Sequence, residues 1–286
     1  MKILIEPLSI ENLYVENVDG YVLPLQNYAV QSKKYFTLEE IKKVRKKYPE
    51  KEIFISLNKN FFNAEIEPLK ELLLELDKLH FNGIFFYDLA ILELKRELNL
   101  TTDLVWSQTH MVNNYKTCNY YHSKGVKYAL ISKEITLEEI LEIINKTTIT
   151  PMVEVVGLPS VAFSKRHLLT NYYTDLNKTV NKELLITEKN TNTLYEVLED
   201  EAGTNFFLNT VMNGTSIIKD LFSVKAPYII MREYGLESSF FSKLLEDTKK
   251  YIEGSCLDEE YIIKYKDYGN TNFFFKKTIY KVKKDD

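Results

Sequence analysis

Short apolar runs alternate with amphipathic stretches through the first half of the chain. Seven runs rich in Val, Ile, Leu, Phe and Tyr predict strands, at residues 3–6, 21–25, 52–57, 83–88, 104–109, 128–132 and 152–156. Most of these runs are apolar throughout, which is typical of parallel strands covered on both faces. Amphipathic segments that favour helices lie between them, at residues 37–48, 66–80, 89–98, 112–123 and 136–145.

This alternation predicts the α/β class and, within it, a (β/α)8 TIM-like barrel rather than an open sheet. Residues 228–232 supply the eighth strand, and a helix over 236–252 follows. We expect one domain over residues 1–286, because the chain is too short for a separate C-terminal domain beside a barrel.

The interval 158–224 breaks the rhythm before the last barrel strand. It is rich in Asn, Thr, Tyr and Glu, and its strand-like pieces at 184–188, 194–198 and 206–208 favour antiparallel pairing. We expect an irregular, β-containing insertion over the barrel mouth, ending in a short helix at 216–222. Residues 255–286 form a C-terminal extension in which 272–282 predict one more strand or hairpin.

Two predicted helices begin with the same five residues, TLEEI, at Thr37 and at Thr136. Each start is a capping box, in which the Thr hydroxyl accepts from the third helical amide and a Glu reaches back to the capping amide. The residues on either side of the two TLEEI segments do not match, so the identity indicates the same type of helix N-terminus and not an internal repeat.

Composition narrows the class of protein. With 45% hydrophobic and 27% charged residues the chain is a globular protein, and its net charge of −4 makes direct nucleic-acid binding unexpected. No apolar stretch approaches the length of a membrane span, and the N-terminus lacks a signal-peptide cleavage site. Because two Cys can form no disulfide framework, we expect a reducing, cytoplasmic location.

Arginine is scarce in this lysine-rich chain. The four arginines are Arg45, Arg96, Arg166 and Arg232 among 37 basic residues, a skew typical of an AT-rich genome. An arginine that survives such drift is a candidate for bidentate binding of a carboxylate or phosphate. Arg45 and Arg96 lie on charged helix faces, whereas Arg166 and Arg232 lie beside strand ends and are the better candidates for ligand binding.

Active sites of such barrels form at the C-terminal ends of the strands. The polar residues found there are Glu6, Asn58, Asp88, Gln108, Lys133, Glu134, Glu154, Arg232 and Glu233. Glu154 is the sharpest case, because a carboxylate inside an apolar strand is costly unless it is paired. A partner such as Lys133 or Arg166 would satisfy Glu154 without any catalytic role, so both interpretations stay open.

Several enzyme classes find no support. The four His have no metal-ligand spacing, the chain has no Gly-x-Ser-x-Gly elbow and no Gly-rich phosphate loop, and two Cys cannot form a four-cysteine site. We therefore expect no metal and no cofactor.

Residues 153–157 (VEVVG) and 162–172 (AFSKRHLLTNY) resemble the signature of the collagenase-like peptidases, peptidase family U32. That signature runs Glu-Val-x-x-x-Gly and then Ala-Tyr-Ser-Gly-Arg-Cys-Leu-Leu-Ser-Asn-Tyr. Weaker matches follow the family order at 56–58, 88–89, 107–113, 131–135 and 272–278. The resemblance spans most of the chain and implies a short, barrel-only member.

The resemblance implies a function, but this sequence departs from the family pattern at the cluster-binding residues. Better understood bacterial members look like accessory enzymes of oxygen-independent hydroxylation of RNA bases or of a quinone precursor. They hold an iron–sulfur cluster through four Cys, the first in the Gly-Arg-Cys of the signature. Here Lys165 and His167 replace the Gly and the Cys, and residues 174–209 contain no Cys. The expected protein is thus a cluster-free companion of a cysteine-containing paralogue.

A pocket for a small anionic or aromatic molecule would survive this loss. We expect Glu154 and His167 as catalytic candidates, although His167 could simply fill the space of the lost Cys. The ligand-binding candidates are Arg166, Asn58, Asp88, Gln108, Glu134, Asn171 and Arg232. Two alternatives stay open: a peptidase, as the family name says, and a scaffold without catalysis.

Overall fold

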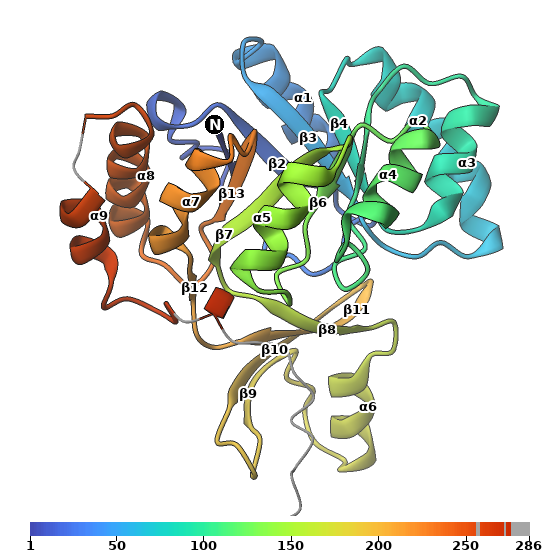
Figure 1. Ribbon diagram of the computed structural model, residues 1–286. Helices are drawn as coiled ribbons and strands as arrows, with labels where there is room; N and C mark the ends of the chain where they lie inside the picture. The colour runs from blue at the N-terminus through green and yellow to red at the C-terminus, as the bar shows by residue number, and fades with distance from the viewer. Residues whose placement is uncertain (256–257, 272, 276–286) are drawn as a thin grey trace, which may run out of the picture.

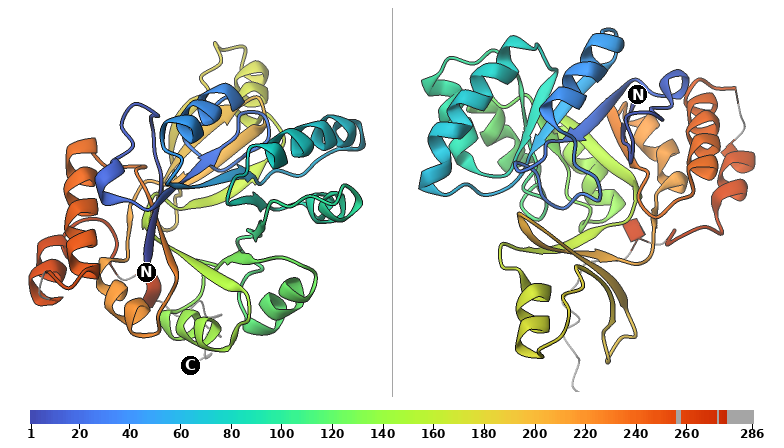
Figure 2. Two further views of the ribbon diagram at one scale, coloured as in Figure 1. Left: turned by 90° about the horizontal axis from the view of Figure 1, so that it is seen from above. Right: turned by 180° about the vertical axis from the view of Figure 1, so that it is seen from behind.

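The computed structural model describes residues 1–255, 258–271 and 273–275. Eight parallel strands close into a barrel with helices around it (Figure 1; Figure 2, left). Their order in the chain is β1 (Lys2–Glu6), β2 (Gly20–Pro24), β3 (Glu52–Leu57), β4 (Gly83–Phe86), β5 (Leu104–Trp106), β6 (Tyr128–Leu130), β7 (Thr150–Gly157) and β13 (Tyr228–Arg232). Strand β13 pairs with both β7 and β1, and β6 pairs with β7. The predicted (β/α)8 barrel is therefore confirmed, including its eighth strand.

The helices on the outside lie where the hydrophobic pattern predicts them. They are α1 (Leu38–Lys47), α2 (Ile66–Lys78), α3 (Leu89–Glu97), α4 (Tyr115–Ser123), α5 (Leu137–Lys146), α7 (Ile218–Ser223) and α8 (Ser238–Ile252), with short 3-10 helices η1 (Val15–Asn17), η2 (Asn63–Glu65) and η3 (Thr215–Ile217). Both predicted capping boxes are present, at Thr37 with Glu40 and at Thr136 with Glu139. These caps satisfy amides that the first helical turn leaves unpaired.

Alternate residues of each strand face two different apolar regions. One set packs under the surrounding helices, and a smaller set fills the barrel interior. Phe54 is central to the interior set, with edge-to-face ring contacts to Phe85, Tyr128 and Tyr228 at centroid distances of 6.0, 5.5 and 6.2 Å. These rings fill much of the barrel interior with packed side chains.

Between β7 and β13 the chain forms a second sheet at the C-terminal end of the barrel (Figure 1). Its antiparallel order is β8 (Ser160–Ser164), β11 (Gly203–Leu208), β10 (Leu194–Asp200) and β9 (Glu183–Thr187). The short strand β12 (Met212–Asn213) then returns to pair with β7. Gly203 has φ +142°, and a Cβ there would lie 2.1 Å from the Ser164 carbonyl oxygen, so the close approach of β8 requires glycine.

This segment contains one helix that the sequence pattern did not predict. Helix α6 (Leu168–Asp175) has His167 at its N-cap position, but the His167 side chain makes no capping bond. Its first amides are held instead by Glu199 of β10, which accepts from Leu169 N at 2.8 Å and from Thr170 N at 3.2 Å. Because the cap comes from a residue 30 positions away, no local pattern predicts this helix.

The C-terminal extension contains helix α9 (Asp258–Tyr265), whereas the sequence predicted only a strand or hairpin further along, at 272–282. Within the predicted strand at 272–282, residues Phe273–Phe275 form the 3-10 helix η4, and the remainder lies outside the described residues. Phe274 is buried and would touch any Cβ placed on Gly214. Across the described ranges, no helix combines the length and the apolar character that a membrane crossing requires.

Candidate functional site

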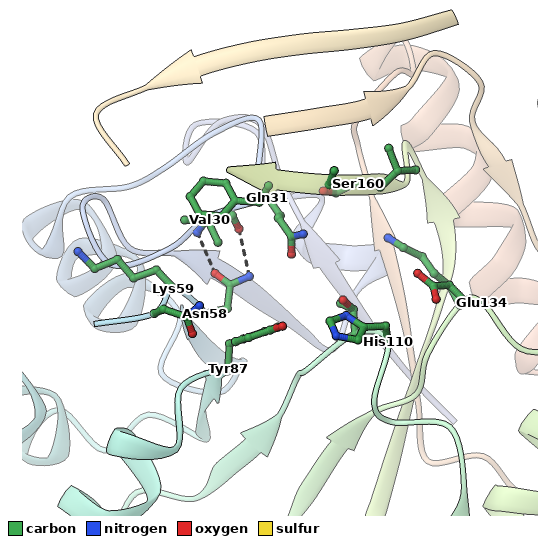
Figure 3. A pocket seen from close by; sticks show the side chains of 14 residues that line it. Val30, Gln31, Asn58, Lys59, Tyr87, His110, Glu134 and Ser160 are labelled. Atoms are coloured by element: carbon green, nitrogen blue, oxygen red, sulfur yellow. Dashed lines mark hydrogen bonds between the residues drawn. The ribbon is translucent and has the colours of Figure 1, made fainter. Parts of the chain in front are cut away.

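A cavity of about 280 Å³ opens at the C-terminal end of the barrel, beneath strand β8 (Figure 3). The loops that follow β2 to β6 form its floor and sides, and β8 forms its roof. The lining residues are Val30, Gln31, Asn58, Lys59, Asn60, Tyr87, Thr109, His110, Lys133, Glu134, Ser160, Val161, Ala162 and Phe163. A narrow extension of about 20 Å³ continues into the barrel interior. We call the larger space, without this extension, the mouth cavity.

Four charged side chains are buried together beside the mouth cavity. Arg232 lies between two carboxylates, with Nε 3.2 Å from Glu6 Oε2 and Nη2 3.1 Å from Glu154 Oε2. Lys133 Nζ lies 3.3 Å from the other Glu154 oxygen. Two carboxylates and two cations therefore balance in charge. Buried charges persist only when they are paired in this way, so this charge quartet explains how β7 tolerates Glu154.

The quartet shifts the protonation equilibria of its members. Burial alone would raise the pKa of Glu154, but the charges of Arg232 and Lys133 outweigh it and hold that pKa below its ordinary value. Burial lowers the pKa of Lys133, and Glu154 opposes this effect only in part. Lys133 is the member of the quartet that also lines the mouth cavity.

Tyrosines complete the hydrogen bonding of the strand-end carboxylates. The Tyr234 hydroxyl donates to Glu6, and Tyr14 donates to Glu233 at 2.6 Å. Burial, reinforced by the Glu6 charge, raises the pKa of Tyr234 well above its ordinary value. Glu233 also accepts from Leu8 N at 2.9 Å, so this strand-end residue ties loops together rather than facing the cavity.

Gln31 is held in a strained conformation at the cavity edge. Its φ of +61° lies in the left-handed region, which a residue with a Cβ adopts at a cost. Its N–H donates to Asn205 Oδ1 of β11 at 2.8 Å, and its carbonyl accepts from Arg232 Nη1 at 3.4 Å. The barrel and the second sheet thus fix this residue from both sides, and its amide points into the cavity (Figure 3).

Three of the predicted ligand-binding residues use their side-chain polar atoms in hydrogen bonds within the protein, and of these only Asn58 lines the mouth cavity. Asn58 exchanges two hydrogen bonds with the Val30 backbone, at 2.9 and 3.0 Å. Asp88 caps α3 at Ala90 N and also accepts from the amide of Phe61. Gln108 accepts from the Trp106 indole at 3.0 Å and donates to a backbone carbonyl at 2.6 Å. Their first effect is to shape the loops, and direct binding by them stays a prediction.

Glu134 lines the mouth cavity, together with two residues that the sequence did not single out for binding. Tyr87 and His110 project into the cavity from the loops after β4 and β5 (Figure 3). Their ring centroids lie 6.3 Å apart at an interplanar angle of 53°. Tyr87 lies near the end of the predicted strand 83–88 and His110 directly follows the predicted strand 104–109, and this strand-end position was the signal that could have revealed them.

The signature residues of the second sheet lie elsewhere. Arg166, His167 and Asn171 have exposed side chains and are not among the residues that line the mouth cavity. Neighbouring Lys165 places its ammonium 3.4 Å from the ring centroid of exposed Phe62. The structure therefore divides the predicted site into a buried quartet with its cavity and an exposed group in the turn after β8 and on α6. Catalytic roles for Glu154 and His167 stay predictions.

The residues do not fit a four-thiolate cluster. The chain has two cysteines, and Cys256 lies outside the described residues. Cys118 is fully buried in α4, on the outside of the barrel, where burial raises the pKa of its thiol to about 11. A cluster of this kind needs four accessible thiolates. Two thiols, one of them buried in a helix outside the barrel, therefore cannot hold such a cluster.

The fold and the cavity define a (β/α)8-barrel protein whose mouth is covered by β8 and contains a cavity. The chain matches Peptidase family U32 over residues 9–225, and it belongs to that family. It is 26% identical to tRNA hydroxylation protein P2 of Bacillus subtilis, across 98% of this chain and 99% of that protein. It is also 26% identical to tRNA hydroxylation protein P1 of the same organism, across 54% of this chain and 38% of that protein.

Among solved structures, 3-hexulose-6-phosphate synthase aligns with a TM-score of 0.46 and 10% identity. The alignment covers 90% of this chain and all of that one. A chitinase from Chromobacterium violaceum aligns with a TM-score of 0.44 and 9% identity, over 86% of this chain and 98% of the chitinase. Likenesses this weak carry no information about the reaction.

Proposed function

We propose that this chain takes part in tRNA hydroxylation as a companion subunit without an iron–sulfur cluster, beside a cysteine-containing relative. The observation that carries the proposal is the end-to-end match to tRNA hydroxylation protein P2. One bacterium contains both this relative and tRNA hydroxylation protein P1, which suits a system built from two members of the family. Both names favour RNA over a quinone precursor as the molecule that is modified.

The donor set of this chain supports the companion role. His167 stands where the family signature has its first cluster cysteine, and the buried Cys118 lies far from that segment in sequence and in a different element. Four thiolates are required for a cluster. The redox centre of the system would therefore belong to the partner, while this chain contributes its barrel pocket.

In this role the mouth cavity binds and orients a small anionic or aromatic molecule. Tyr87 and His110 offer ring faces, the Gln31 amide offers a donor and an acceptor, and Lys133 offers the positive charge. Arg232 and Asn58 fix the walls behind these groups. The exposed group of Arg166, His167 and Asn171 is assigned to contacts outside the cavity.

Anaerobic affinity purification of the tagged protein from its own host tests the companion role. We expect a cysteine-containing relative of the same family to co-purify, with iron and visible absorption in the complex. The chain purified alone should hold iron well below one atom per chain. A colourless single chain from the host, with no family member attached, would contradict the proposal.

The family name makes a peptidase the second candidate. Pure protein incubated with casein and gelatin tests it directly. Cleavage that disappears in Glu154→Gln and His167→Ala would replace our proposal with a local hydrolytic mechanism. Intact casein and gelatin after prolonged incubation would remove the peptidase from consideration.

A further inference from the structure

Lys133 has a cavity in front of its ammonium group and a carboxylate behind it. The residue lines both the mouth cavity and its narrow extension, and its side chain is 10% exposed. Nζ lies 3.3 Å from Glu154 Oε1. Arg232, a second cation, binds the other oxygen of the same carboxylate. Nothing in the family likeness assigns a role to this lysine.

We propose that Lys133 condenses reversibly with the carbonyl group of a small aldehyde or ketone in the mouth cavity, forming an iminium. The neutral amine nitrogen attacks the carbonyl carbon, a C–N bond forms, and the π electron pair moves to oxygen. That oxygen then leaves as water. Overall, one ammonium and one carbonyl give one iminium and one water, and no oxidant or reductant is consumed.

The site provides the free amine that this reaction needs. A lysine reacts only after it loses its proton, and a desolvated lysine beside another cation loses it more readily. Burial lowers the pKa of Lys133 and the charge of Arg232 adds to this effect, whereas Glu154 and Glu6 oppose it without cancelling it. Surface lysines such as Lys127, whose pKa is raised by its bond to Asp103, have no such advantage.

The charge balance of the quartet favours an iminium over an uncharged product. The iminium keeps the positive charge beside Glu154, so two carboxylates still face two cations. Acylation of the same nitrogen would remove that charge and leave Glu154 underpaired, which is costly in a buried site. The pocket is thus suited to carbonyl condensation in particular.

Size and lining set the class of carbonyl compound. A water molecule occupies roughly 30 Å³ of liquid, so about 280 Å³ holds about nine heavy atoms. Tyr87 and His110 beside the cavity accommodate a ring, and the Gln31 amide can pair with a polar substituent. Benzaldehyde and pyruvate both meet these limits and serve as probes.

Reductive trapping on the full-length protein tests the proposal. The chain is incubated with benzaldehyde or pyruvate and sodium cyanoborohydride, which converts an iminium into a stable amine, and the adduct is located by peptide mass spectrometry. We expect Lys133 to be modified several-fold faster than exposed lysines such as Lys127, because its lowered pKa leaves more of the amine unprotonated and the cavity holds the carbonyl compound in front of it. In about 8 M urea, which unfolds most small domains, the cavity is lost and this preference for Lys133 should vanish.

Two variants sharpen the result. Lys133→Arg should abolish the fast adduct, whereas Lys127→Arg should leave it unchanged. If Lys133→Arg fails to fold, mapping the adducts on the protein without substitutions still decides the question. Adducts spread over surface lysines at equal rates, or a fast adduct that persists in Lys133→Arg, would overturn the proposal. Either failure would leave the proposed role in tRNA hydroxylation untouched, because that role rests on a different observation.

Discussion

Arg232 shows what an arginine does here that a lysine could not. Its Nε faces Glu6, one terminal nitrogen faces Glu154, and the other donates to the Gln31 carbonyl. Only a planar fork with several donors reaches three partners in three directions. The scarcity of arginine in this lysine-rich chain was therefore a useful signal at this position. Arg166, the other candidate, is exposed and offers no comparable contact in the described structure.

Glu154→Gln tests the buried quartet through its pH dependence. The amide keeps the shape but cannot neutralise two cations, so we expect a loss of about 3–5 kcal/mol in the free energy of unfolding at pH 7. The folded pKa of Glu154 is lowered, so its stabilising effect is present above the unfolded pKa of about 4.3 and is lost as pH falls through the folded pKa.

Urea titrations followed by fluorescence of Trp106, the single tryptophan, measure this difference. The gap between the original protein and Glu154→Gln should narrow steadily below about pH 4. Glu93→Gln is the matched control, because Glu93 forms only an exposed pair with Arg96 and its removal should cost under about 1 kcal/mol. A gap that stays constant from pH 7 to the acid limit would show that Glu154 does not act through its charge.

At the scale of elements, the strands end earlier than the apolar runs. The predicted strands at 83–88, 104–109 and 128–132 end at Phe86, Trp106 and Leu130. The residues beyond these ends, among them Tyr87 and His110, turn into the loops that form the mouth cavity. The apolar pattern locates a strand well but does not show where its hydrogen bonding to the next strand ends, because the end of pairing depends on the neighbouring strands.

Helix α6 depends on a cap from another element, and Glu199→Ala tests this dependence. The variant removes the carboxylate that holds Leu169 N and Thr170 N. A lost cap costs about 1 kcal/mol or more, so amide hydrogen exchange in residues 168–175 should accelerate roughly tenfold while barrel amides stay protected.

Glu183→Ala, at an exposed position on β9 of the same sheet, should leave exchange in α6 unchanged. If exchange in 168–175 were identical in the two variants, Glu199 would not be the cap. If the barrel amides exchanged faster as well, the second sheet and the barrel would unfold as one unit.

At the scale of the molecule, the barrel architecture can be predicted from the sequence more completely than the arrangement of the candidate site. Continuous apolar runs separated by amphipathic helices define a parallel barrel, and residues 228–232 close it through β13. The site depends on contacts between distant segments: Asn205 fixes Gln31, and Glu6 meets Arg232 across the closing seam. Such pairs have no local pattern. For Glu154, one of the two proposed partners, Lys133, was identified correctly from charge alone.

The most direct test of the central claim is mass spectrometry of tRNA nucleosides from a host strain that lacks this chain. We expect nucleosides carrying one added oxygen atom to disappear, and to return when the original sequence is supplied again. A copy with the exposed substitution Glu183→Ala should restore them as well. A tRNA profile that is the same with and without the chain would contradict its role in tRNA hydroxylation.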